Sequence, residues 1–324
     1  MKPYDPETLL AETRAFNAEL ERQLAAMPSM DTVPPEQTRR ARREGRGIYP
    51  APVFLPEART VQVRGPAGSV PLRIIAPERE PAGAFLHMHG GGWTLGEHDM
   101  QDLRLQRLAR ETGLTAVSVG YRLAPENPYP AAPDDCEAAA LWLVGDEGRR
   151  AVGAGPLAIG GDSAGAHLAA VTLLRLRDRH RIRGAFAAAV FQYGGFDLSM
   201  TPSQRLWGDR NLVLSGPIIR WFGDQFVGEY DHERRRDPDI SPMYAELSSM
   251  PPAIFTVGTE DPLLDDTLFM EARWRAAGHA TELRIWPEAP HGFIALPMTV
   301  ADVALSAEHE FLRRTLGLPP GPVQ

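Results

Sequence analysis

The chain is poor in cysteine: Cys136 is the one thiol among its 324 residues. A single cysteine excludes an intrachain disulfide and a cysteine-rich metal site. Its neighbours Asp134, Asp135 and Glu137 are acidic, whereas a catalytic thiol needs electropositive surroundings. We therefore interpret Cys136 as a buried or idle thiol rather than a nucleophile.

Long apolar runs are also lacking. No stretch approaches the roughly 18 uninterrupted apolar residues that a membrane-spanning helix requires. The first residues, Met1 to Glu7, contain no apolar run of signal-peptide length. We therefore expect no stable membrane insertion and, by default, a cytoplasmic protein.

Positive charge is in deficit. The 34 basic residues face 42 acidic ones, so the formal net charge is −8. Nucleic-acid-binding proteins more often present a basic face, and we expect no nucleic-acid partner. The charge balance itself says nothing about chemistry.

Two stretches differ from the rest of the chain. Residues 6–24 carry apolar side chains at helical spacing, and a second helix begins at Pro34-Pro35. Residues 198–245 hold aromatic side chains among charges and prolines, and this stretch is too long for a plain loop. We expect both stretches to form helices outside the main fold.

The remaining elements predict the fold class. Residues 59–64 and 70–75 alternate as two strands of a hairpin. Further strands are expected at 84–88, 115–119, 156–159, 184–191, 253–257 and 282–286. Helices are expected between and after them, at 103–109, 134–143, 164–176, 265–277 and 300–316. We assign the helix caps to the acidic pairs Asp134-Asp135 and Asp265-Asp266. The alternation predicts an α/β fold, a mostly parallel central sheet flanked by helices, with an antiparallel start.

The sequence Gly161-Asp162-Ser163-Ala164-Gly165 lies between a predicted strand and a predicted helix. This is the G-x-S-x-G pattern in the context that positions a nucleophilic serine on a strained turn. The pattern alone arises by chance in about one such chain in ten, so the alternative is a serine that merely caps the helix. The strand before the turn and the helix after it favour Ser163 as a nucleophile.

A second motif, His89-Gly90-Gly91-Gly92-Trp93, follows the strand at 84–88. Consecutive glycines let backbone N–H groups approach a developing oxyanion closely. A phosphate-binding loop would need G-x-G-x-x-G or a following Lys-Ser/Thr, which are absent here. We interpret His89 as a residue that shapes this loop, and expect a further N–H donor at Ala164, directly after the nucleophile.

A nucleophilic serine needs a histidine base, and that base needs an orienting acid. His291 alone among the later histidines lies on a loop directly after a predicted strand; the others are His167, His180, His232, His279 and His309. Asp261 likewise follows the strand at 253–257, with Glu260 as the adjacent alternative. The carboxyl ends of parallel strands share one sheet edge, where ligands bind in such folds.

Together these motifs, with Tyr121-Arg122-Leu123-Ala124-Pro125-Glu126, Asp261-Pro262-Leu263 and His291-Gly292-Phe293, resemble the hormone-sensitive-lipase-like (bacterial family IV) carboxylesterases of the α/β-hydrolase fold. The resemblance extends from about residue 59 to the end of the chain. It implies a catalytic domain over residues 51–324 and a helical cap built from residues 1–50 and the insertion at about 198–245. It also implies that Gly91, Gly92 and Ala164 provide the oxyanion N–H groups.

The predicted function is a serine carboxylesterase that hydrolyses short- to medium-chain esters through Ser163, His291 and Asp261, without a metal or organic cofactor. Two alternatives stay open: amide or acetyl-group deacylation at the same site, and a non-catalytic small-molecule receptor. Relatives that lost catalysis typically lost the histidine, so the presence of His291 disfavours the receptor. The expected partner is a small ester, and the resemblance also allows a homodimer. The candidate walls of the substrate pocket are Trp93, Phe196 and Trp207, although a role in the core explains them equally well.

Overall fold

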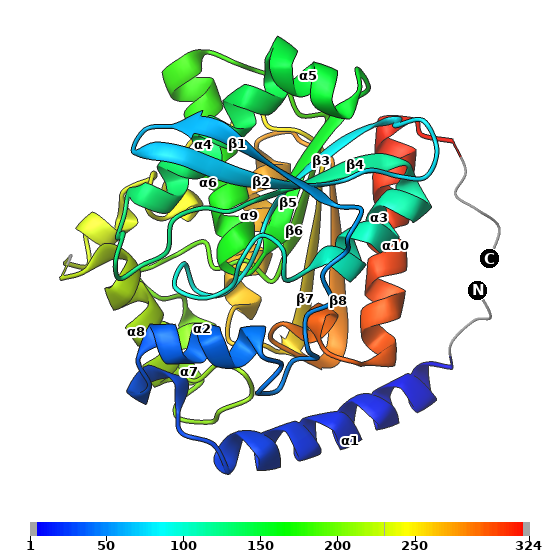
Figure 1. Ribbon diagram of the computed structural model, residues 1–324. Coiled ribbons are helices and arrows are strands. Elements are labelled where there is room, and N and C mark those ends of the chain that lie inside the picture. Colours follow the sequence, from blue (N-terminus) through cyan, green and yellow to red (C-terminus); the bar gives the residue numbers. More distant parts are fainter. Residues whose placement is uncertain (1–4, 230, 320–324) are drawn as a thin grey trace.

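A computed structural model describes residues 5–229 and 231–319. Its centre is an eight-stranded sheet with the strand order β1-β2-β4-β3-β5-β6-β7-β8 (Figure 1). The strands are β1 (Arg59–Gly65), β2 (Gly68–Ile75), β3 (Gly83–Met88), β4 (Leu114–Val119), β5 (Leu157–Asp162), β6 (Ala188–Gln192), β7 (Ala253–Glu260) and β8 (Thr281–Pro290). Strand β2 is antiparallel to β1 and β4, and every later pair is parallel. The predicted sheet, with its antiparallel start, is confirmed.

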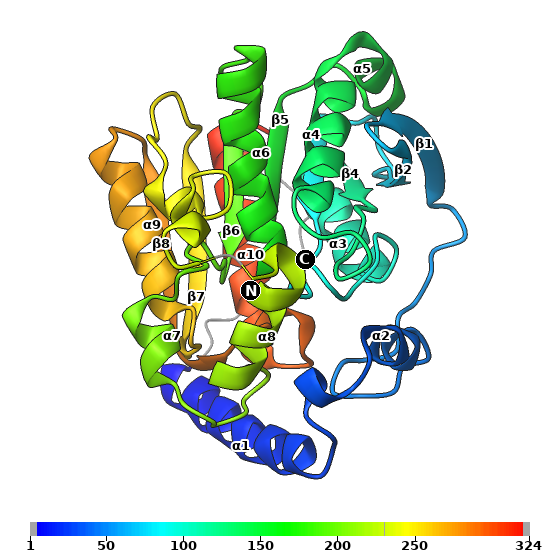
Figure 2. The same cartoon turned by 90° about the vertical axis from the view of Figure 1, so that its left-hand side faces the viewer.

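Helices cover both faces of the sheet (Figures 1 and 2). The longer ones are α3 (Asp102–Thr112), α4 (Ala131–Val144), α6 (Ala164–His180), α9 (Leu264–Ala276) and α10 (Thr299–Leu316). Helices α3 and α10 pack together on one side, and α4 and α6 pack together on the other. A short helix, α5 (Asp146–Val152), follows α4.

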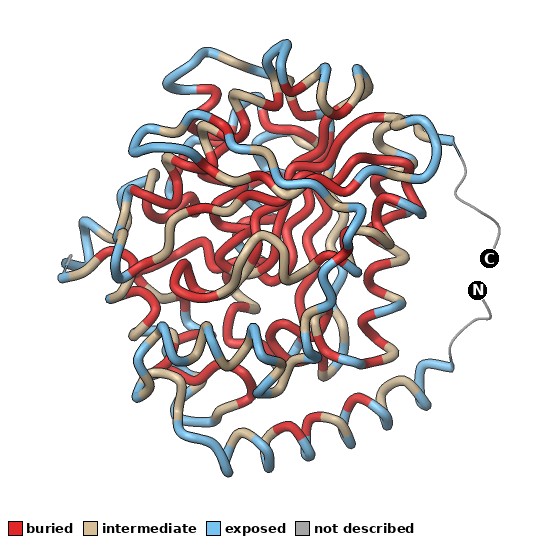
Figure 3. The backbone as a smooth tube through the Cα atoms, in the orientation of Figure 1, coloured by how far each residue is buried: buried red, intermediate tan, exposed pale blue. Residues whose placement is uncertain are grey.

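The central strands feed two separate cores by simple alternation. Phe85 packs with Leu105 of α3 and Phe311 of α10, whereas its neighbour Leu86 packs with Leu168 of α6. Every residue of β3, β4, β5 and β6 is buried, and apart from a few polar side chains such as His87, Asp162 and Gln192 these strands are runs of apolar or small residues (Figure 3). The centre of the sheet is therefore covered on both faces.

The N-terminal segment and the insertion lie at one end of this sheet, at the bottom of Figure 1. They contribute α1 (Pro6–Ala25), η1 (Met30–Thr32), α2 (Pro35–Arg43), α7 (Pro202–Leu206), α8 (Gly216–Val227), η2 (Arg234–Arg236) and η3 (Pro242–Tyr244). Helix α1 is held by its Asn17 amide, which donates to the Glu288 carbonyl at 2.7 Å. Helix α2 is held by Arg39, which pairs with Glu126 at 2.8 Å. The helices expected in both stretches are present.

The predictions for the starts of helix α4 and strand β6 are wrong. Helix α4 begins at Ala131, three residues early, so Asp134 and Asp135 do not cap it. Asp135 instead pairs with Arg122 at 2.8 Å. Strand β6 begins at Ala188 rather than 184, because Arg181 ends helix α6 in a left-handed conformation and a loop follows.

The acidic pair at the start of α9 has a tertiary role as well. Neither Asp265 nor Asp266 is the helix cap, which is Leu263. The Asp266 carboxylate accepts the backbone N–H groups of Phe196 and Asp197 at 2.8 and 2.9 Å. The pair therefore anchors the start of the insertion rather than the helix.

None of the helices in the described part of the chain combines the length and apolarity that crossing a bilayer demands.

Candidate active site

Ser163 lies on a strained turn between β5 and α6. Its backbone has φ +57° and ψ −118°, a conformation that L-residues rarely adopt. A Cβ added at Gly161 or Gly165 would lie 2.2 or 2.0 Å from the Met88 carbonyl oxygen. These two positions therefore require glycine, and the tight turn sets the Ser163 side chain at the first turn of α6.

Two further side chains complete a hydrogen-bonded chain with Ser163. The Nε2 atom of His291 lies 2.9 Å from the Ser163 Oγ, and its Nδ1 atom lies 2.9 and 3.1 Å from the two Asp261 carboxylate oxygens. This arrangement suits a ring in which Nδ1 donates to the Asp261 carboxylate and Nε2 accepts from the serine hydroxyl. Asp261 is 1% exposed and also accepts the Leu263 N–H at 2.8 Å, so its orientation is fixed.

Glu260, the alternative acid, is engaged elsewhere. Its carboxylate pairs with Arg210, which also pairs with Glu21 of α1 at 2.6 Å. Asp261, by contrast, contacts His291 Nδ1 with both of its carboxylate oxygens. The geometry selects Asp261.

The glycine loop faces Ser163 with an unusual backbone. Gly91, Gly92 and Trp93 have φ values of +122°, +60° and +57°. A Cβ at Gly91 would lie 2.2 Å from the Leu95 carbonyl oxygen, and one at Gly92 would lie 2.1 Å from the Phe222 ring. Among the described residues, no hydrogen bond uses the backbone N–H of Gly91, Gly92 or Ala164. These three donors are available to a ligand.

A buried ion pair between Arg104 and Asp162 lies next to the glycine loop and holds it in place. The Arg104 guanidinium donates to the Asp162 carboxylate at 2.9 Å, and the Gly90 N–H donates to the same carboxylate at 3.1 Å. Burial alone would raise the pKa of Asp162, but the charge of Arg104 holds it below its ordinary value. The residue before the nucleophile is thus a fixed anion that ties the glycine loop to the turn.

Two buried histidines near the loop are structural. The Tyr121 hydroxyl donates to the His89 carbonyl at 2.7 Å, and the Tyr121 ring stacks on the His89 ring. These contacts agree with a loop-shaping role for His89. The Trp93 indole donates to His167 Nδ1 at 3.1 Å, and His167 Nε2 donates to the Ile240 carbonyl at 2.7 Å. Burial lowers the pKa of each histidine to about 4, so both are neutral at pH 7.

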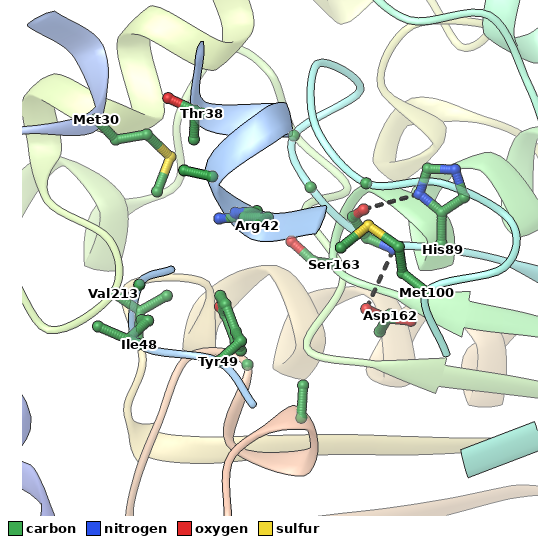
Figure 4. A pocket seen from close by; sticks show the side chains of 18 of the residues that line it. Met30, Thr38, Arg42, Ile48, Tyr49, His89, Met100, Asp162, Ser163 and Val213 are labelled. Carbon is green, nitrogen blue, oxygen red and sulfur yellow. Dashed lines mark hydrogen bonds between the residues drawn. The ribbon is translucent and has the colours of Figure 1, made fainter. Parts of the chain in front are cut away.

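Two cavities meet at Ser163. The larger has a volume of about 720 Å³ and is walled by the N-terminal segment, the glycine loop and part of the insertion (Figure 4). The smaller has a volume of about 70 Å³ and lies toward Trp93, Gly195 and Leu263. Gly92, Leu214 and Phe222 line both, so the Phe222 side chain stands at their boundary.

Of the three residues predicted to line the substrate pocket, one lines a cavity and two do not. Trp93 lines the smaller cavity. Phe196 lines neither cavity, because its fully buried ring packs edge-on against Phe191 in the core. Trp207 also lines neither, and its indole donates to the Arg210 carbonyl at 2.8 Å. The sequence did not single out Tyr49 or Phe222, which do line the larger cavity; no local pattern marks them.

Other chemistries find little support in the side chains. Burial raises the pKa of the Cys136 thiol well above its ordinary value, and the residue lies in the core. Among residues 5–229 and 231–319, no group of three or more His, Cys, Asp or Glu side chains could hold a metal ion.

Comparison with known proteins identifies the family of this chain. A family model described as the α/β-hydrolase fold matches residues 85–295. The carboxylic ester hydrolase LipN of Mycobacterium tuberculosis is 37% identical over 76% of this chain and 67% of its own length. An acetyl esterase of Salmonella agona is 29% identical over 81% of each chain. The solved structure of a hormone-sensitive lipase from a metagenome library has a TM-score of 0.80 and 28% identity, over 94% of this chain and 98% of that one.

The chain belongs to this α/β-hydrolase family. It is an enzyme, a carboxylic ester hydrolase related to the hormone-sensitive-lipase-like esterases. The alternative of a non-catalytic receptor is thereby set aside.

Proposed function

We propose that this enzyme is a serine carboxylesterase in which Ser163 is the nucleophile, His291 the general base and acid, and Asp261 the residue that orients His291. The observation that carries the proposal is the unbroken hydrogen-bonded chain from the Ser163 hydroxyl through His291 to Asp261. The backbone N–H groups of Gly91, Gly92 and Ala164 also support the proposal, because they are free to bind the oxyanion.

The reaction proceeds in two halves. Ser163 Oγ attacks the ester carbonyl carbon while His291 Nε2 takes the hydroxyl proton, and the carbonyl electron pair moves onto oxygen. The C–O bond to the alcohol then breaks, the alcohol takes the proton from His291, and an acyl-serine remains. Water attacks the acyl-serine with its proton going to His291, and the acid leaves as Ser163 regains that proton.

The oxyanion is the charge that the site must stabilise. Each backbone donor aimed at such an oxygen typically contributes a factor of about 100 to 1000 in rate. The φ values of Gly91 and Gly92 support this role, because a side chain at either position would collide with its surroundings. Asp261 stays ionised and stabilises the imidazolium form of His291 as it appears.

The two cavities support a preference for short to medium chains. A cavity of about 70 Å³ accommodates a few non-hydrogen atoms, whereas about 720 Å³ accommodates a larger group. One part of the ester is therefore small and the other bulky. We further propose that the N-terminal segment and the insertion act together as a cap, since both contribute walls to the larger cavity.

The test is a panel of p-nitrophenyl esters with acyl chains from two to twelve carbons, measured on wild type and Ser163→Ala. We expect turnover that is highest for the shorter chains and that Ser163→Ala abolishes. A phosphonate ester probe should label Ser163 in the wild type and leave the variant unlabelled. Full activity in Ser163→Ala would disprove the assignment.

Acetyl-group removal is a second candidate, because the smaller cavity suits a two-carbon acyl group. The similarity to the Salmonella acetyl esterase also favours it. Matched acetate and butyrate esters, each with its amide counterpart, would separate the readings. A strong preference for acetate or for the amide would favour deacylation.

The homodimer and the cytoplasmic location stay predictions. Sedimentation of the purified protein and fractionation of the cells that produce it would test them.

A further inference from the structure

The charged residues that line the larger cavity are almost all paired. Asp162 pairs with Arg104, and Glu97 pairs with Arg43 of α2. Arg46 pairs with its neighbour Glu44. These pairs neutralise their own charges, so none of them leaves an uncompensated charge for a ligand.

Arg42 is different. It lines the same cavity as Ser163, and Figure 4 shows both of them there together with Tyr49. Its guanidinium lies over the Tyr49 ring, 5.0 Å from the ring centre. Among the described residues it has no carboxylate partner and no hydrogen-bond acceptor. Burial lowers its pKa, yet a guanidinium remains protonated in proteins.

Two other arginines of α2, Arg39 and Arg43, have a structural role. Arg39 donates to the Thr94 and Ala124 carbonyls at 2.7 and 2.6 Å and pairs with Glu126. Arg43 pairs with two carboxylates. Each ties the helix to the body of the protein, whereas Arg42 makes no such tie. An unpaired, partly desolvated cation is unfavourable unless something in the cavity neutralises it.

A second unpaired donor lies in the same wall. The Tyr193 hydroxyl is buried and has no hydrogen-bond partner among the residues that the structure describes. Its ring packs against the His291 ring with 5.1 Å between centres and lines the larger cavity, but the hydroxyl oxygen itself is buried and is not accessible to a ligand. Among the charged side chains of the described lining, Arg42 is thus the one without an ionic partner.

We propose that Arg42 is a substrate-binding residue that selects esters bearing a carboxylate on the part that occupies the larger cavity. The guanidinium fork suits a carboxylate because it can donate two parallel hydrogen bonds. The inference rests on the proposed function of Ser163 and narrows its substrate class from esters in general to anionic esters. The carboxylate sits away from the reacting carbon and takes no part in the chemistry.

The experiment uses two substrate pairs, each an anionic ester with its neutral methyl ester. In the first pair, mono-4-nitrophenyl adipate and its methyl ester, the charge lies on the acyl side. In the second, 4-(butanoyloxy)benzoate and its methyl ester, the charge lies on the alcohol side. The measured quantity is the ratio of kcat/KM for the anionic ester to that for the neutral ester.

For Arg42→Gln we expect this ratio to fall about 10- to 100-fold in one of the two pairs, mainly through KM, as for loss of a charge-assisted hydrogen bond. Arg42→Lys retains the charge and should recover part of the ratio. Arg40→Gln, an exposed position on the same helix, is the matched control and should leave the ratio unchanged.

Two results would overturn the inference. One is a ratio that changes less than about twofold in both pairs; the other is an equal loss on anionic and neutral esters, which means that Arg42 only supports the fold. If Arg42→Gln does not fold, wild type alone decides: the anionic ester should be preferred over its neutral methyl ester in at least one pair, and a preference for the neutral ester in both pairs refutes the idea. Hydrolysis of the neutral esters, abolished in Ser163→Ala, reports on the proposed function separately.

Discussion

Replacing Gly92 with alanine tests the role of the glycine loop most directly. The added Cβ would lie 2.1 Å from a Phe222 ring carbon. Non-bonded carbons prefer at least about 3.5 Å, so the ring or the loop must move by about 1.4 Å. The backbone adds strain of about 1 to 2 kcal/mol, since Gly92 has φ +60°.

The effect of Gly92→Ala on kcat depends on whether the glycine loop or the Phe222 ring moves. The loop carries the proposed oxyanion donors, and Phe222 is a buried residue of helix α8. If the loop moves, the Gly92 N–H leaves its position, and we expect kcat on p-nitrophenyl butyrate to fall about 100-fold or more. The thermal unfolding temperature should also fall, because strain and collision both act in the folded state.

A double-mutant cycle separates the collision from the strain. Phe222→Ala removes the ring, so Gly92→Ala/Phe222→Ala should recover about tenfold of the kcat that Gly92→Ala loses. Gly208→Ala is the matched control, because Gly208 has φ +71° with no atom within 4 Å of an added Cβ. It should lower stability by about 1 kcal/mol and leave kcat unchanged.

Two results would refute this reasoning. If Gly92→Ala retains wild-type kcat, the loop N–H groups do not stabilise the oxyanion. If the double variant is no better than the product of the two single effects, the Phe222 ring is not what displaces the loop.

Three further perturbations test the surroundings of the site. Asp261→Asn should lower kcat on p-nitrophenyl butyrate about 10,000-fold, because it favours the wrong tautomer of His291. Glu260→Gln should change kcat less than about twofold. Equal effects of the two substitutions would contradict the choice of Asp261 as the acid. Arg104→Met leaves Asp162 as an unpaired buried anion, and urea unfolding should show a loss of about 3 kcal/mol; an unchanged midpoint would mean that the pair contributes nothing. Burial lowers the pKa of His167 in the folded state to about 4, below its unfolded value of about 6.5. Its contribution to the free energy of unfolding is therefore complete above pH 6.5 and is lost as the pH falls toward 4, by about 1.4 kcal/mol per pH unit. Urea titrations at pH 7, 6 and 5 should therefore show a smaller pH dependence in His167→Gln, and an equal slope would contradict that pKa.

The residues that we propose to react could be identified from sequence because each is fixed by local structure. Ser163 is marked by two glycines that its turn requires, and Asp261 and His291 each follow a strand. Since β7 and β8 are parallel neighbours, their ends bring the two side chains to one place. Local pattern and sheet topology together were sufficient for this geometry.

The cavity walls could not be predicted in the same way. Tyr49 and Phe222 lie about 170 residues apart and meet only through the tertiary fold. The aromatic content of the insertion suggested Trp207 as a wall, but its indole satisfies a carbonyl of its own loop instead. Asp135 and Asp266 illustrate the same limit, because acids near helix starts were bound by distant partners rather than by their own helices.

Different segments of the chain supply the proposed catalytic residues and the walls of the larger cavity. The atoms proposed to react belong to short loops of the sheet, whereas much of the larger cavity is made by residues 24–53 and by the insertion. Exchange of residues 24–53 between related enzymes would replace Arg42 and Tyr49 together while the hydrogen bonds among Ser163, His291 and Asp261 stay in place. Such an exchange would therefore alter the proposed substrate-binding wall without altering the proposed catalytic residues.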